Sequence, residues 1–311
     1  MKLRLLGLTL CVSAASLALS AAADAATDDN AVTRFMQEAL TTVSAGNIGT
    51  PAAGRVYAMT TVAMYDAVNG INSATGNNQK RRTSALVSGA GAPPNGIGDV
   101  AAAAAAHAVL VSFNPSPARR AALDAALLAE TNRFGGVGDN KVSRSLEWGK
   151  FVGEEVVRIR STDGTQVPES IPSAGGIGKF PTAFNGAQFR NMTPFGVSSV
   201  TPFLSTTGPA PVESRQYALD VFEIRLFGAP ETAGGFDFDA QRDAIAAFWF
   251  FPGGSITETG SWFAAAIEIA KQQNTTASTS DTARLFARIG MSVADGVTHS
   301  WTEKARFLTW R

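Results

Sequence analysis

Histidine and cysteine are scarce in this chain of 311 residues, and each shortage excludes a class of functional site. The only histidines are His107 and His299, so a centre built on several imidazoles cannot form within the chain. Cys11 is the only cysteine, which excludes an intrachain disulfide and a metal site made of several thiolates. The fold must therefore be held together by its hydrophobic core.

An excess of one charge is also missing. Lys and Arg together number 26, as do Asp and Glu, so the formal net charge is zero. Without a basic surplus, we expect no binding to the phosphates of a nucleic acid. Hydrophobic residues make up 45% of the chain and charged residues only 17%, with a mean hydropathy of +0.05. This composition excludes a disordered polyelectrolyte and is typical of a globular protein.

Residues 1–25 have the pattern of a cleavable signal peptide. Lys2 and Arg4 precede an apolar stretch at 5–19, and the small residues at 21–25 fit an A-x-A cleavage site. We expect export to the periplasm or the extracellular space, with an uncleaved anchor as the alternative. No second run of 18 apolar residues follows, so the mature chain is not expected to be an integral membrane protein.

The remaining residues, 26–311, are predicted to form a single helical domain. Apolar residues recur at helical spacing, as in the stripe Val56, Met59, Val62, and no alternating strand pattern competes with them. The fold class predicted is all-α, a helical bundle. The expected helices span 29–40, 52–71, 101–113, 116–134, 139–160, 214–227, 238–251, 259–273 and 280–311.

One long segment, 163–211, interrupts the helical pattern. It holds seven of the fourteen prolines and seven glycines, a density that neither helix nor regular strand tolerates. Phenylalanines recur through it, which predicts a segment pinned across the helical body. They are Phe180, Phe184, Phe189, Phe195 and Phe203. A boundary between two domains is the alternative interpretation.

The expected last helix carries the strongest chemical signal. Lys304 and Arg311 are seven residues apart, about 700° of helical rotation, which places both cations on one face, with Trp301 one turn before Lys304. An ammonium and a guanidinium at this spacing can hold one oxyanion from two sides. The alternative is a pair of solvated charges at the end of an amphipathic helix.

Several stretches, taken in order, resemble the N-terminal part of the vanadium-dependent haloperoxidases, a family related to the type 2 phosphatidic acid phosphatases. They are 55–71, 101–110, 156–164, 241–249, 261–262, 282–287 and the closing motif Trp301-x-x-Lys304-x6-Arg311. The resemblance implies a vanadate or phosphate pocket in which Lys304 and Arg311 bind anion oxygens and Trp301 lines the wall. It also implies vanadate as cofactor, with hydrogen peroxide and halide as substrates.

The chain departs from that family in its missing histidine motifs. Neither the Ser-Gly-His motif nor the late Arg and His pair of the family occurs in the sequence. His107 lies among alanines and is expected to be a hydrogen-bonded core histidine, and His299 lies about 140° from the Lys304 face and is expected to be structural. We therefore assign no catalytic residue and no direct metal ligand.

The prediction is an exported haloperoxidase-like protein that is catalytically incomplete, truncated or split. A homo-oligomer or a complementing C-terminal half is the expected protein partner. An acid phosphatase-like relative that uses phosphate in the same pocket is one alternative function. A non-catalytic helical scaffold is the other.

Overall fold

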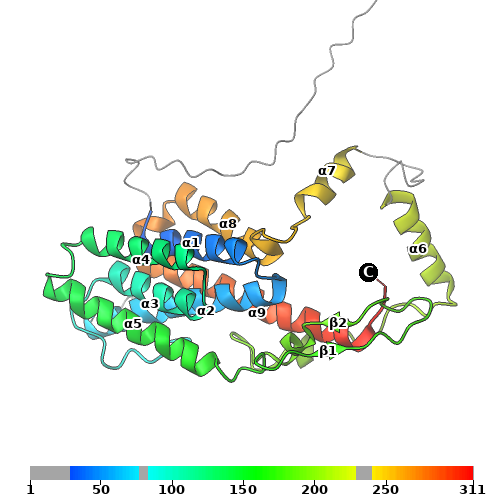
Figure 1. Ribbon diagram of the computed structural model, residues 1–311, viewed down its shortest axis with the longest axis horizontal. Helices are drawn as coiled ribbons and strands as arrows, with labels where there is room; N and C mark the ends of the chain where they lie inside the picture. The colour runs from blue at the N-terminus through cyan, green and yellow to red at the C-terminus, as the bar shows by residue number, and fades with distance from the viewer. Residues whose placement is uncertain (1–28, 77–82, 229–239, 311) are drawn as a thin grey trace, which may run out of the picture.

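The computed structural model describes residues 29–76, 83–228 and 240–310. These residues form helices joined by irregular segments, with one antiparallel pair of two-residue strands, so the expected all-α class is confirmed (Figure 1). The helices are α1 Ala31–Ala45, α2 Thr50–Ala74, α3 Gly98–Ser112, α4 Pro117–Asn132, α5 Asn140–Arg160, α6 Arg215–Phe227, α7 Ala240–Phe248, α8 Thr257–Gln272 and α9 Thr279–Phe307. The strands are β1 Ser170–Ile171 and β2 Phe184–Asn185.

Helix α2 lies at the centre of the helical body and contacts α3, α5 and α9 (Figure 1). Small residues let these helices approach closely. A Cβ atom added to Gly149 of α5 would lie 2.2 Å from the carbonyl oxygen of Ala101 in α3. A Cβ atom added to Gly290 of α9 would lie 2.2 Å from the Thr61 hydroxyl of α2. Packing as close as this admits no larger residue at either glycine.

The core joins α2, α8 and α9 through aromatic side chains. The Tyr57 ring lies 5.1 Å from that of Phe263, which lies 6.3 Å from that of Phe286, and all three are fully buried. The Tyr57 hydroxyl donates a hydrogen bond to the carbonyl of Ile256, and burial raises the pKa of this phenol, which stays neutral.

Helix boundaries follow the expected ones closely, with two differences near the N-terminus. The first helix runs on to Ala45, because Thr42 and Val43 are buried and continue its apolar face. Helix α2 begins at Thr50, with Pro51 in its first turn, where the missing N–H costs nothing. Of the helix expected at 238–251, α7 covers 240–248, residues 249–251 are not helical, and residues 238–239 lie outside the described residues.

The segment 163–211 contains only β1, β2 and two short 3-10 helices, η1 Ala187–Asn191 and η2 Thr201–Phe203, so its irregular character is confirmed. Phenylalanines and ionic groups both hold it on the helical body, and Phe189 and Phe195 pack against core clusters. Phe184 is buried, but Phe203 is 64% exposed. Arg160 also donates to the carbonyl of Thr193, and its guanidinium lies 3.6 Å from the ring centroid of Phe195.

Two buried aspartates each accept three backbone hydrogen bonds from a loop. Asp295 of α9 accepts from the N–H groups of 195–197, at 2.6–3.1 Å. Asp66 of α2 accepts from those of 85–87, at 2.7–2.8 Å. Each carboxylate satisfies loop donors that the helices cannot reach, which fixes the path of both loops across the body.

Helices α6 and α7 form a peripheral arm that stands away from the helical body (Figure 1). No residue of α6 is buried. Large apolar side chains are exposed on both helices, among them Phe222 at 58% and Phe248 at 69%. Within the described residues, no helix combines the length and the apolar character needed to cross a membrane.

Candidate functional site

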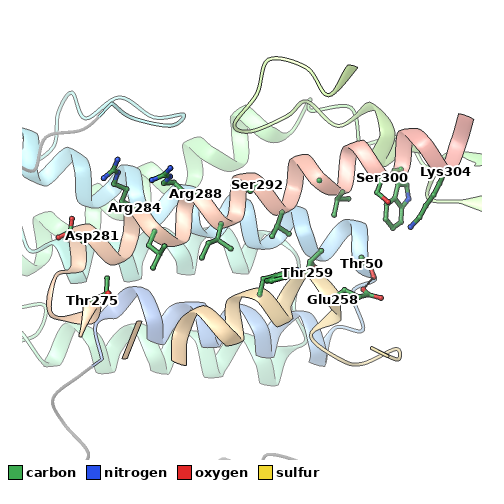
Figure 2. A pocket seen from close by; sticks show the side chains of 17 residues that line it. Thr50, Glu258, Thr259, Thr275, Asp281, Arg284, Arg288, Ser292, Ser300 and Lys304 are labelled. Atoms are coloured by element: carbon green, nitrogen blue, oxygen red, sulfur yellow. Dashed lines mark hydrogen bonds between the residues drawn. The ribbon is translucent and has the colours of Figure 1, made fainter. Parts of the chain in front are cut away.

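A groove of about 1130 Å³ runs along the outer face of α9 and is bounded by α8 and the start of α2. Figure 2 shows the side chains along it, from Asp281 at one end of the row on α9 to Lys304 at the other. The charged lining residues are Glu258, Asp281, Arg284, Arg288 and Lys304. Three positive charges against two negative ones make the groove weakly attractive to an anion.

Helix α9 exposes this face because its neighbouring face is buried, chiefly against α2. Phe286, Gly290, Ala294 and Val297 form the buried stripe, at helical spacing. Val297 of this stripe and the half-buried Val293 also line the groove. The groove face therefore begins directly beside the core.

Lys304 and Trp301 lie together at the C-terminal end of the groove. The Lys304 Nζ atom lies 4.1 Å from the centroid of the Trp301 ring, within the range of a cation–π interaction. The Trp301 ring in turn lies 6.4 Å from that of Phe184, so the irregular segment supports it from behind. The Trp301 Nε1 atom is buried and has no hydrogen-bond acceptor among the described residues. Trp301, predicted to line the pocket, and Lys304, predicted to bind the anion, are thus neighbours.

The expected continuation of α9 to residue 311 is wrong. The helix ends at Phe307, and Leu308 takes a left-handed conformation with φ 46°, its N–H donating to the Lys304 carbonyl. The chain then pairs with the irregular segment: Thr309 bridges to Lys179, and the Phe180 N–H donates to the Leu308 carbonyl. This long-range backbone pairing ends the helix.

Helical periodicity therefore gives no basis for placing Lys304 and Arg311 on one face. Arg311 itself lies outside the described residues.

Neither histidine lines the groove. His107 Nε2 lies 2.6 Å from a carboxylate oxygen of Asp124, which links α3 to α4. Its expected hydrogen bond is confirmed, but the ring is half-buried at the helix surface instead of lying in the core. His299 Nε2 lies 3.0 Å from the carbonyl oxygen of Phe203 and ties α9 to the irregular segment, as expected of a structural residue.

Arg284 and Arg288 are groove residues that the sequence analysis missed. They are one turn apart, point to the same side of α9 in Figure 2, and have no ion pair among the described residues. Glu258, on the α8 side, accepts a hydrogen bond from the Thr50 hydroxyl at 2.7 Å. The sequence could have indicated them, because Arg284 and Arg288 are spaced i, i+4 on the helix, next to the apolar positions of Phe286 and Gly290.

Among solved structures, the fold is similar to that of a bacterial vanadium-dependent iodoperoxidase. The TM-score is 0.69 at 18% sequence identity, and the match covers 90% of this chain and 69% of the iodoperoxidase chain. No protein-family model matches the sequence, and no curated protein matches it. At this identity the likeness establishes a haloperoxidase-like fold.

Proposed function

We propose that this chain is a haloperoxidase-like protein whose site at the C-terminal end of α9 binds vanadate. Lys304 and Arg311 bind its oxygens, and Trp301 lines the wall. The observation that supports the proposal is the position of Lys304, which lies on the groove of a chain with a haloperoxidase-like fold. Hydrogen peroxide and halide are the substrates that this relationship suggests.

The residues present fit an oxyanion by charge. The Lys304 ammonium is oriented by the Trp301 ring and lies on a groove with a positive balance of charge. An ammonium group has three hydrogen-bond donors and no acceptor, and a tetrahedral oxyanion offers acceptor oxygen atoms on every side. Bound vanadate supplies the activation of hydrogen peroxide toward a halide.

The contribution of the described residues is electrostatic. Lys304 neutralises negative charge on the bound anion, and the groove lining within the described residues offers no imidazole for proton transfer. The sequence also lacks the Ser-Gly-His motif. We therefore propose that this chain binds the anion weakly and does not oxidise halide without further histidines.

Vanadate titration by calorimetry tests the proposal. We expect weak binding that salt screens, and a loss of about tenfold or more in affinity for Lys304→Ala, because a charge-assisted hydrogen bond contributes about 1.5–3 kcal/mol. Lys150→Ala on α5 is the matched control, because the Lys150 side chain is 70% exposed and lies outside the groove lining. Equal affinity of wild type and Lys304→Ala would contradict the assignment, and so would rapid iodide oxidation by the chain alone.

We also propose that residues 1–25 direct export and are removed, leaving 26–311 as one helical domain. The n-region, apolar stretch and small residues of this segment support the proposal. Intact mass measurement of the protein recovered from a secreting host should show a chain that begins within a few residues of position 26. A full-length mass in the exported fraction would contradict cleavage.

A further inference from the structure

Helix α6 has apolar side chains on two faces, yet no residue of the helix is buried. Leu219, Phe222 and Leu226 share one face at helical spacing, and Val221 with Ile224 lies on another. Phe222 is 58% exposed and Ile224 is 69% exposed. A helix that is apolar on more than one side is normally covered by other protein.

The groove on α9 has the complementary character. Leu285, Ile289 and Val293 provide apolar side chains along it, and Trp262 of α8 adds an aromatic ring that is 57% exposed. The span from Arg284 to Lys304 is about 30 Å at 1.5 Å per residue, whereas the thirteen residues of α6 need about 20 Å. One helix of this length therefore fits along the groove.

The charges beside the two apolar surfaces are opposite. Glu223 lies next to the Phe222 face of α6, is exposed, and has no ion pair among the described residues. Arg284 and Arg288 lie on the rim of the α9 groove and are likewise exposed. A helix laid along the groove with its Phe222 face inward can bring Glu223 to Arg284 and Arg288.

We propose that the occupant of the groove is α6 of a second copy of this chain, and that two copies exchange these helices reciprocally. Each chain carries both the helix and the groove, so a two-fold axis satisfies both at once and closes the assembly as a dimer. The contact covers the exposed apolar face of α6 and pairs Glu223 of one copy with Arg288 of the other. The contact uses the same groove as the proposed vanadate site, and dimerisation is measured without vanadate.

Sedimentation velocity over a range of protein concentrations tests the proposal. The wild-type chain should form a dimer whose proportion rises with concentration. Phe222→Asp, Glu223→Arg and Arg288→Glu should each weaken dimerisation by about tenfold or more, because each removes a buried contact or opposes like charges. Combining Glu223→Arg with Arg288→Glu should restore most of the affinity, since the pair is exchanged.

The matched control is Arg120→Glu on α4, an exposed arginine outside the groove, which should leave the dimer unchanged. Circular dichroism of each variant establishes that the fold is retained. A monomer at all concentrations would overturn the proposal, as would failure of the charge exchange to restore dimerisation. A wild-type monomer that binds phosphatidylcholine vesicles would overturn it too, by assigning the apolar face of α6 to lipid.

Discussion

Helices α2 and α6 are both rich in apolar residues, yet their surroundings are opposite. Eighteen of the 25 residues of α2 are buried, and none of the 13 residues of α6 is. The difference lies in side-chain size. Helix α2 presents Gly54, Gly70 and several alanines, which let neighbouring helices approach, whereas α6 has one alanine among bulky side chains. Apolar side chains favour burial, and small residues allow neighbouring helices of the same chain to pack closely enough to bury them.

This comparison places most of the folding stability in the helical body and little of it in the arm. Substituting the same residue type in both regions should break or confirm that division most directly. Phe286→Ala in α9 should lower the free energy of unfolding by about 3–5 kcal/mol, because a fully buried ring leaves a cavity. Phe222→Ala in α6 should change it by less than about 0.5 kcal/mol in dilute solution. Urea denaturation followed by circular dichroism measures both.

The ion network of Asp163, Arg55 and Arg160 at the end of α5 tests the same contrast between body and arm with charged groups, because it lies within the helical body. The Asp163 Oδ2 atom lies 2.7 Å from Arg55 Nε and 3.2 Å from Arg160 Nε. Asp163→Asn should cost about 3 kcal/mol at pH 7, since it leaves two guanidinium groups without their carboxylate. The exposed pair of Lys150 and Glu154 on α5 is the control, and Glu154→Gln should cost less than about 1 kcal/mol.

The same network predicts how stability depends on pH. Burial alone would raise the pKa of Asp163, but Arg55, Arg160 and the hydrogen bond from Thr165 together lower it below its ordinary value. The stabilisation is therefore present above the pKa of the unfolded aspartate, about 3.9, and is lost as pH falls through the lower folded-state pKa. The stability difference between wild type and Asp163→Asn should shrink below pH 4. A difference that stayed constant down to pH 2 would contradict this account.

Close helix packing gives the smallest expected effect. Gly149→Ala should destabilise by about 1–3 kcal/mol, because the new methyl group meets the Ala101 carbonyl and α3 must move away from α5. Gly138→Ala is the matched control, since no atom lies within 4 Å of a Cβ at that position. Thermal unfolding should separate the two variants by several degrees, and equal melting temperatures would contradict the close approach of the two helices.

Most of the fold was predictable because its helices are marked locally. Expected helices at 116–134 and 139–160 agree with α4 and α5 within two residues, because prolines, capping side chains and glycines near helix ends act at short range. The end of α9 was not predictable in this way. It depends on backbone pairing of Thr309 with Lys179, which is 130 residues away in the sequence.

The candidate site was predictable in its residue types and only partly in its geometry. Trp301 and Lys304 lie one turn apart within a helix, so their contact follows from spacing. The relation of Lys304 to Arg311 depends on chain beyond the helix end, where rotation per residue no longer applies. Arg284 and Arg288 were missed because a groove is a property of neighbouring elements, here α8 and the start of α2, and not of α9 alone.

The irregular segment is fastened at separate points, and this has a practical consequence for protein engineering. Between the β1–β2 pairing and the contact of Phe180 with Leu308, residues 174–177 are exposed, with Gly175 and Gly176 in left-handed conformations. Both flanks are anchored independently, so an epitope or a fluorophore-binding peptide inserted between Ala174 and Gly175 adds only loop entropy, about 0.6 kcal/mol for each doubling of loop length. This turn is therefore a suitable attachment point for immobilising or labelling the protein.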